Sequence, residues 1–273
     1  YLYLKKWLKL VKSMIKKILE GSIIIFFSIL MLQFVAWAFV ENWNYPNIFP
    51  SEISFRMWDT ALSQKELSTL GFSVFLSVTV TFLSVVIAYP IAKALALYEI
   101  KYKGIIRFIL IIPFLIPMTS ISMGIHLSFI KLGIANNVIG VILLELFVCI
   151  PYAVLGLEPI IKIVGDDIEK QARSLGASAF MTFRKITLPL ISPGLVITST
   201  LVFLVSISQY FVVSLIGGGS VKTYTLIMFP YIYAKDRHIS SIYGIIFLVT
   251  CVIVIMAFRF MISWIYKEKK WKF

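Results

Sequence analysis

The chain has 273 residues, of which 60% are hydrophobic, and its mean hydropathy is +0.94. Soluble domains average nearer half apolar residues, so this composition excludes an ordinary soluble domain and favours lipid as the solvent. The formal net charge of +13 would also suit a nucleic-acid-binding protein. We expect no nucleic acid as a partner, because the basic residues lie beside long apolar runs, which is the positive-inside pattern of membrane proteins.

Six apolar stretches are long enough to cross a bilayer, which takes roughly 20 residues. They predict spans at residues 21–40, 67–97, 105–130, 136–161, 188–215 and 239–265. A basic amphipathic lead-in, residues 1–20, is expected at the cytoplasmic membrane surface, and residues 266–273 form a basic tail. Most Lys and Arg fall in the cytoplasm if both termini lie there. The sequence therefore predicts an all-α integral membrane protein of the cell membrane, with six transmembrane helices in residues 21–265.

Several segments predict departures from straight spans. Residues 41–66 are expected outside the membrane, with a short helix at residues 54–62, and residues 222–238 predict a re-entrant or interfacial segment. Pro113 and Pro117 must kink the third span, because each removes a backbone hydrogen bond. Such backbone is tolerated where it is buried in protein or lines a cavity. The kink therefore serves packing or flanks a translocation path, which would then include Thr119 and Ser120.

Polar residues inside two spans are candidates for a path. Glu145 lies within the fourth span, where an ionisable side chain is a functional-site hypothesis. It could face a cationic substrate, pair with a partner subunit or remain neutral. Ser206, Ser208, Gln209 and Tyr210 form a polar cluster in the fifth span. This cluster could line the path or form hydrogen bonds between helices.

The polar loop at residues 162–190 stands out between two apolar spans. Its centre predicts a helical start at residues 169–175, a turn at Gly176 and a second helical piece at residues 177–185. Glycine can adopt the positive φ that ends a helix. Pro189 and Pro193 suit the first turn of the next helix. The loop is therefore predicted to form a short helix–turn–helix that a soluble partner could bind.

The spacing in this loop resembles the EAA loop of permease subunits of ATP-binding-cassette importers. Ala172, Gly176, Ile186, Leu188 and Pro189 hold the matching positions. Lys170 and Gln171 replace the Glu and first Ala of the pattern, and Glu169 lies one residue early. The resemblance implies the type I ABC importer permease fold, with this loop as the coupling helix that docks on the ATPase. The implied coupling residues are Glu169, Lys170, Ala172, Arg173, Leu175, Gly176, Ala179, Phe180, Phe183, Ile186, Leu188 and Pro189.

The resemblance also implies roles and partners. The apolar residues Leu175, Ala179, Phe180 and Phe183 would fill a cleft on the ATPase, with Arg173 and Lys170 at its rim. The partners would be two ATPase subunits, a second permease subunit that we expect to be a different chain, and an extracytoplasmic substrate-binding protein. ATP and Mg would bind the ATPase subunits, so this chain would need no cofactor or metal.

The sequence contains no pattern typical of an enzyme. The glycine-rich stretch at residues 217–223 is not a phosphate loop, because Val221 stands where the motif needs glycine before Lys-Thr. His126 and His238 have no ligand-forming neighbours in sequence, and no nucleophile–base pair is evident. The ATPase activity is therefore expected on another polypeptide.

The sequence predicts a group of possible transported solutes rather than a single solute. Residues 173–178, Gln209-Tyr210 and the glycines at 217–219 resemble permeases for polyamines, thiamine, iron(III) and phosphonates. The alternative is an ATP-independent secondary transporter or channel subunit. That alternative predicts paired intramembrane charges or inverted repeats, and neither is evident.

Overall fold

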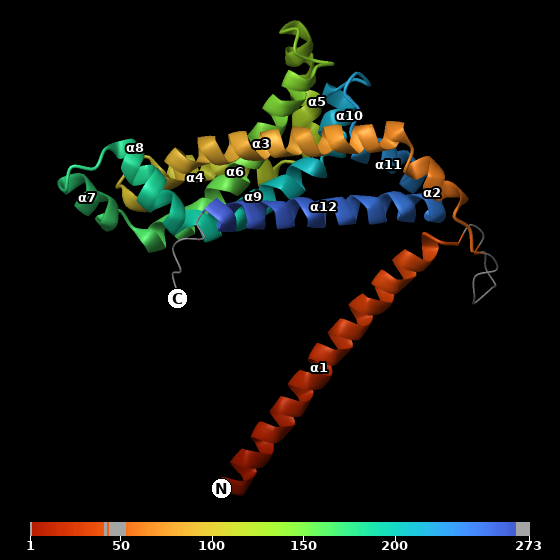
Figure 1. The fold of residues 1–273 in the computed structure, drawn as a ribbon, viewed down its shortest axis with the longest axis horizontal. Coiled ribbons are helices and arrows are strands. Elements are labelled where there is room, and N and C mark those ends of the chain that lie inside the picture. Colours follow the sequence, from red (N-terminus) through yellow and green to blue (C-terminus); the bar gives the residue numbers. More distant parts are fainter. Residues whose placement is uncertain (1, 41–42, 44–52, 266–273) are drawn as a thin grey trace. The chain divides into compact units, whose positions relative to one another are not determined.

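The computed structural model describes residues 2–40, 43 and 53–265, and this part of the chain is α-helical (Figure 1). The predicted tail at 266–273 and most of the loop at 41–52 lie outside the described residues. The elements are α1 (Leu2–Trp37), α2 (Arg56–Ala61), α3 (Gln64–Leu97), α4 (Lys103–Leu115), α5 (Met118–Lys131), α6 (Val138–Val164), α7 (Asp167–Ser174), α8 (Ala179–Thr182), the π-helix η1 (Phe183–Thr187), α9 (Leu188–Ile207), α10 (Tyr210–Ile216), α11 (Tyr224–Tyr233) and α12 (Arg237–Ile265).

Five helical stretches in the described chain are long and apolar enough to cross a membrane. They are Lys12–Trp37, Gln64–Leu97, Val138–Val164, Ala179–Ile207 and Arg237–Ser263. Each overlaps a predicted span, and a sixth is added if α4 and α5 together count as one. The prediction of a helical membrane protein is confirmed. The short helix predicted at residues 54–62 is also present, as α2.

The third predicted span is not one kinked helix. Helix α4 ends at Leu115, and α5 starts at Met118 after a bend of 100°. Between them Ile116 is extended, with φ −97° and ψ 127°. Proline disfavours helical backbone in the residue before it, so Pro117 accounts for this break. Pro113, by contrast, lies within α4.

The fifth predicted span, residues 188–215, has different ends in the structure. Helix α9 stops at Ile207, and α10 begins after Ser208 and Gln209. At the other end α8, η1 and α9 follow one another without interruption. Pro189 lies in the first turn of α9, as predicted, although the helical backbone runs into α9 from η1. Pro193 lies inside α9, which corrects its predicted place in a first turn. The Leu188 N–H bonds the Phe183 carbonyl in the π pattern just before the proline.

The described chain divides into two compact units, of which the first takes in residues 1–63 and 231–246. In it, α1 continues from the basic lead-in through the first span, with no break at Gly21. The surface location of the lead-in stays a prediction. The Trp58 indole N–H donates to the Ala38 carbonyl at 2.9 Å. His238 Nδ1 lies 3.1 Å from the Trp37 carbonyl, so the start of α12 contacts the end of α1.

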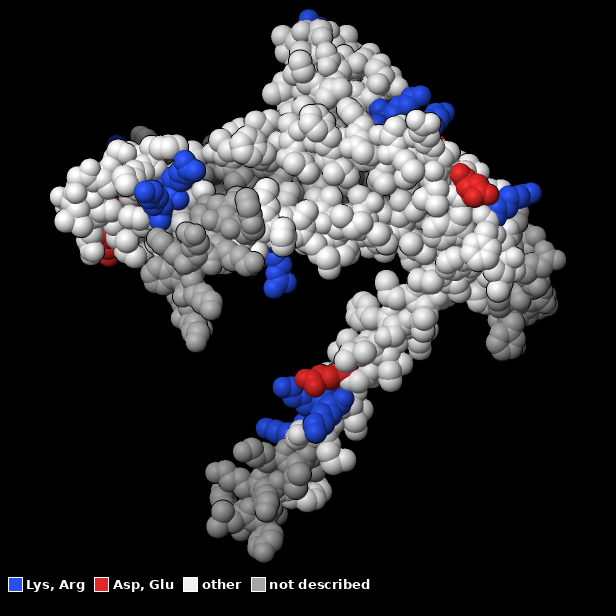
Figure 2. Space-filling view, in the orientation of Figure 1, with Lys and Arg blue, Asp and Glu red and all other residues white. Residues whose placement is uncertain are grey.

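The second unit, residues 64–230 and 247–273, contains the main core. Helices α3, α6 and α9 run side by side in Figure 1, and α7 and α8 lie at one end of them. Small residues let these helices approach closely: a Cβ on Gly156 would lie 2.5 Å from Thr198 Oγ1. Figure 2 shows wide uncharged stretches along this bundle. The core side chains are Val80, Ala88, Ala92, Leu95, Leu110, Cys149, Ala153, Val154, Leu157, Ile161, Ile191 and Val202.

Candidate functional site

The loop between α6 and α9 begins with a well-defined turn. Gly165 ends α6 with φ +67°, and α7 follows from Asp167. The first turn of α7 carries Asp167 and Glu169 and its last turn carries Arg173, so the charges complement the helix dipole. The predicted helical start is confirmed, two residues earlier than expected.

Helix α7 ends in a Schellman motif, in which two N–H groups beyond the helix bond carbonyls of its last turn. The Gly176 N–H donates to the Arg173 carbonyl at 2.9 Å, and the Ala177 N–H donates to the Ala172 carbonyl at 3.0 Å. The motif needs positive φ, and Gly176 has φ +87°. The predicted glycine turn is confirmed. It satisfies carbonyls that a helix end would otherwise leave unpaired.

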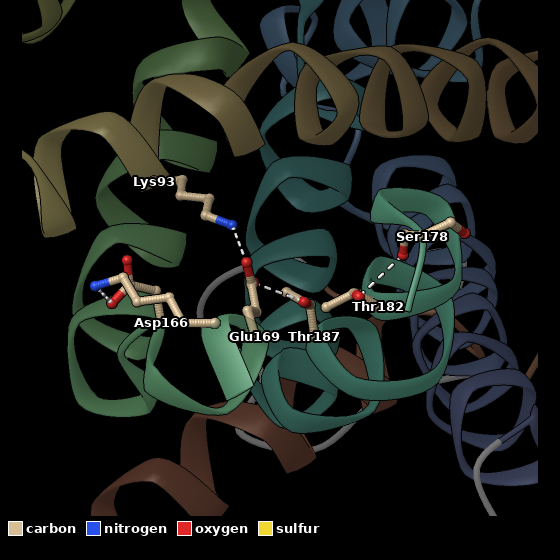
Figure 3. Close-up of polar contacts among 7 residues, drawn as sticks. Lys93, Asp166, Glu169, Ser178, Thr182 and Thr187 are labelled. Carbon is tan, nitrogen blue, oxygen red and sulfur yellow. Dashed lines mark hydrogen bonds and ion pairs between the residues drawn. The ribbon is translucent and has the colours of Figure 1, made fainter. Parts of the chain in front are cut away.

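The second short helix of the loop starts with a side-chain cap. Ser178 is extended, and its Oγ accepts from the Met181 N–H at 3.3 Å. The Thr182 hydroxyl donates to the Ser178 carbonyl at 2.9 Å. These bonds fix the start of α8, which four residues separate from the end of α7 (Figure 3).

Glu169 points toward the interior of the unit (Figure 3). Its Oε2 accepts from Lys93 Nζ of α3 at 2.5 Å, and its Oε1 accepts from the Thr187 hydroxyl of η1 at 2.6 Å. The Glu169 side chain is 12% exposed and that of Lys93 is 20% exposed. We call these three residues the Glu169 clamp. The acidic residue of the loop thus joins α7 to α3 and to the start of α9.

The two basic loop residues expected at the rim are solvent-exposed. Lys170 Nζ lies 2.7 Å from Asp166 Oδ1, four residues earlier. The hydrogen bond with Asp166 raises the pKa of Lys170, so this lysine is charged at neutral pH. Arg173 is exposed in the last turn of α7. The outer face of α7 therefore carries Lys170, paired with Asp166, at the position where the EAA pattern has glutamate.

The end of the loop presents apolar side chains to solvent. Leu175 is 89% exposed and Phe180 is 72% exposed, on either side of the Gly176 turn. Ala179 beside Phe180 is exposed as well. Large apolar side chains exposed together on a well-ordered turn are typical of a binding surface.

The other predicted coupling residues are half-buried. The Phe183 ring packs edge-on against Tyr89 of α3, with ring centroids 5.3 Å apart, and is half-buried. This position differs from the expectation that Phe183 fills a partner cleft. Ala172, Ile186, Leu188 and Pro189 are half-buried too, so they support the loop from within.

Two of the predicted path residues meet in the core. The Ser206 hydroxyl donates to Glu145 Oε2 at 2.5 Å, between α9 and α6. Glu145 is 1% exposed and Ser206 is 3% exposed. In this conformation Glu145 is packed inside the unit, and its partner is an interhelical hydroxyl.

The other predicted path residues lie elsewhere. Thr119 and Ser120 are exposed in the first turn of α5. Ser208 is exposed and donates back to the Leu204 carbonyl at 2.7 Å, next to the break between α9 and α10. Gln209 is half-buried at that break, and Tyr210 stacks on Phe229 with centroids 4.1 Å apart. The structure therefore brings Glu145 and Ser206 together and places the rest on α5, on α10 and in the break before α10.

Sequence reasoning did not find Lys93 and Thr187. Lys93 is 76 residues before Glu169, and nothing in the local sequence pairs the two. A lysine near the inner end of a predicted span was the available signal, since such a charge needs a partner. Among the described residues, no group of three or more His, Cys, Asp or Glu could hold a metal ion.

The sequence of residues 84–267 matches the family described as binding-protein-dependent transport system inner membrane component. This match covers more than half of the chain. The chain belongs to this family. The matched region contains the whole loop, both of its helices and the Glu169 clamp.

Individual relatives of the chain are named as permease proteins of transport systems. The chain is 29% identical over 174 residues to a probable sulfate transport system permease protein of Marchantia polymorpha, covering 59% of this chain and 60% of that protein. It is 26% identical over 197 residues to a spermidine/putrescine transport system permease protein of Haemophilus influenzae, covering 65% and 64%. It is 28% identical over 167 residues to a molybdenum transport system permease protein of Mycobacterium bovis, covering 57% and 63%. The chain thus spans about three fifths of the length of these curated relatives.

Solved structures support the fold. A bacterial ABC transporter involved in the import of the acidic polysaccharide alginate has a chain that superposes with a TM-score of 0.61 at 17% identity, covering 92% of this chain and 95% of that chain. The MetNI methionine ABC transporter in an inward-facing conformation has one with a TM-score of 0.51 at 20% identity, covering 76% and 99%. The predicted type I ABC importer permease fold is confirmed.

Proposed function

We propose that this chain is the transmembrane permease subunit of a binding-protein-dependent ABC importer, coupled to a separate ATPase through the loop at residues 162–190. The observation that carries the proposal is the exposed pair Leu175 and Phe180 on the Schellman turn. Full burial of one such side chain contributes roughly 1.5–3 kcal/mol, so the two together are an apolar anchor for a contact. Ala179, Arg173 and Lys170 surround them and complete the docking surface.

The proposed assembly follows from this role. It contains two ATPase subunits that bind ATP and Mg, this chain, a second permease subunit of different sequence, and an extracytoplasmic binding protein. The chain itself has no catalytic residues in this scheme. It lies in the cell membrane with both termini and the loop in the cytoplasm, which places most of its Lys and Arg there. Membership of a binding-protein-dependent family argues against the alternative of an ATP-independent transporter or channel.

The proposed mechanism is alternating access. ATP-driven closure of the ATPase subunits moves the loop, and α9, which is continuous with α8 and η1, carries that movement into the bundle. Thr119, Ser120, Ser208, Gln209 and Tyr210 are the proposed path residues, because they lie at helix breaks or helix starts. Irregular backbone at membrane depth is tolerated where it lines a cavity or is buried in protein.

For the solute we propose a polyamine first among the four predicted groups. A relative named for spermidine and putrescine transport supports it, whereas relatives named for sulfate and molybdenum indicate that oxyanions also belong among the candidates. Glu145 adds no support for a cation, since it is buried against Ser206.

Co-purification tests the proposal. The full chain is expressed with ABC ATPase subunits encoded in the same genome, and retained ATPase is measured for wild type, Leu175→Asp and Leu132→Asp. Leu132 is a matched control, because it is 70% exposed but lies in the turn after α5. We expect Leu175→Asp to lower retention at least about tenfold, since 1.4 kcal/mol corresponds to tenfold. Retention of no ATPase by wild type, or equal losses in the two variants, would overturn the proposal.

A further inference from the structure

The Glu169 clamp attaches the loop to a helix that is distant in sequence. Glu169 belongs to α7, Thr187 to η1 and Lys93 to α3, and all lie in the second unit. Both carboxylate oxygens of Glu169 have donors. The side chains of Glu169 and Lys93 are mostly buried, so the pair is poorly screened by solvent compared with a surface ion pair.

A second contact lies one helical turn away on α3. Tyr89, four residues before Lys93, holds the Phe183 ring of η1 at a centroid distance of 5.3 Å. Residues four apart share one face of a helix, so α3 contacts the base of the loop along a single face. Pro90 stands between the two contacts inside α3 and removes one of its backbone hydrogen bonds. The loop therefore contacts α3 on both sides of Pro90.

The segment that Thr187 contributes also has unusual geometry. Residues 183–187 form a π-helix between α8 and α9. Such turns are rare and are frequent at functional sites. The clamp bridges this segment, because Glu169 bonds Thr187 at its end while Phe183 at its start rests on α3. Movement of the loop therefore has two routes into the bundle: along the chain into α9, and across the clamp into α3.

We propose that Glu169 is a positioning residue whose clamp makes α7 and the inner end of α3 move as one body, so that α3 receives the displacement of the coupling loop directly. This inference rests on the proposed function for the source of the movement. It assigns Glu169 an internal partner, so the outer surface of the loop meets the ATPase with Leu175 and Phe180 rather than with this acid.

Electron paramagnetic resonance of the full chain tests the clamp. Spin labels at Ser174→Cys on α7 and Tyr98→Cys after α3 report the distance between loop and helix, and both positions are exposed. The native cysteines are buried, so they remain unlabelled. We expect one narrow distance peak in wild type. In Glu169→Gln and in Lys93→Glu the population of that peak falls at least about tenfold, because a mostly buried charge that loses its partner is strongly destabilised.

Exchange of the two charges separates a specific clamp from a general loss of folding. The double variant Lys93→Glu with Glu169→Lys restores the narrow peak if the two side chains act on each other. Arg184→Gln is the matched control, because it removes an exposed basic residue of the same π-helix and leaves the peak unchanged. A narrow peak in Glu169→Gln, or no recovery in the double variant, would overturn the clamp.

Nucleotide trapping tests the movement itself. With ATPase bound and trapped by ATP and vanadate, the Ser174–Tyr98 distance stays constant in wild type and shifts in Glu169→Gln, whereas retained ATPase is equal in both. A Ser174–Tyr98 distance that shifts in wild type overturns the inference. The inference also fails if Glu169→Gln keeps the narrow distance peak but loses the ATPase, since Glu169 would then contact the ATPase itself. If wild type retains no ATPase, the proposed function is contradicted but the clamp is not, because the distance measurement on the isolated chain still tests the clamp.

Discussion

Replacing Gly176 by alanine isolates the conformational requirement of the coupling turn. Gly176 has φ +87°, and a Cβ built there meets no other atom within 4 Å. A methyl group therefore adds no clash, and its cost comes from left-handed backbone alone, roughly 1–2 kcal/mol for a residue with a Cβ. If the ATPase binds only the turned loop, this cost weakens binding by about 5–30-fold.

The affinity of the detergent-solubilised chain for its ATPase subunit measures this effect. Gly176→Asn is expected between wild type and Gly176→Ala, because asparagine tolerates left-handed backbone better than alanine. Gly133→Ala is the matched control: Gly133 has φ +69°, also meets nothing within 4 Å, and lies in the turn after α5. Both alanine variants should lose similar thermal stability, and only Gly176→Ala should lose affinity. An unchanged affinity for Gly176→Ala, or equal losses at the two sites, would refute the reasoning.

Two further predictions concern the bundle that supports the loop. A Cβ on Gly194 would lie 2.5 Å from Ile160 Cγ1, so Gly194→Ala overpacks α6 against α9 and lowers the melting temperature in detergent, at a cost of about 1–3 kcal/mol. Gly124→Ala, with no atom within 4 Å in α5, should raise it, because alanine is favoured in helices by roughly 0.5–1 kcal/mol; the same shift in both would contradict this. Ser206→Ala removes the donor to Glu145 and costs roughly 1–3 kcal/mol, since a buried acceptor loses its partner. Glu145→Gln keeps an acceptor and should lose less stability, and the reverse order of melting temperatures would show that the hydrogen bond contributes little.

Much of the candidate site could be predicted from local sequence. The turn at Gly176 follows from a glycine between two short helical patterns, and the structure has positive φ there. The exposed positions of Leu175 and Phe180 follow from their place beside that turn in a polar loop. The direction of Glu169 did not follow, because an acid in a helix first turn is equally compatible with solvent, a partner or the interior. Only the position of Lys93, 76 residues earlier, decides among these.

Hydropathy and charge pattern alone identify this chain as a helical membrane protein and locate its polar loop, whereas the third predicted span is two helices and the fifth has different ends. Apolar length and charge asymmetry are local properties, so they need no knowledge of packing. The tertiary structure decided what depends on residues far apart: the 100° bend between α4 and α5, the pairing of Glu145 with Ser206, and the position of Phe183 on α3. Each of these balances a local preference against contacts with another helix, and a linear sequence does not state which helices touch.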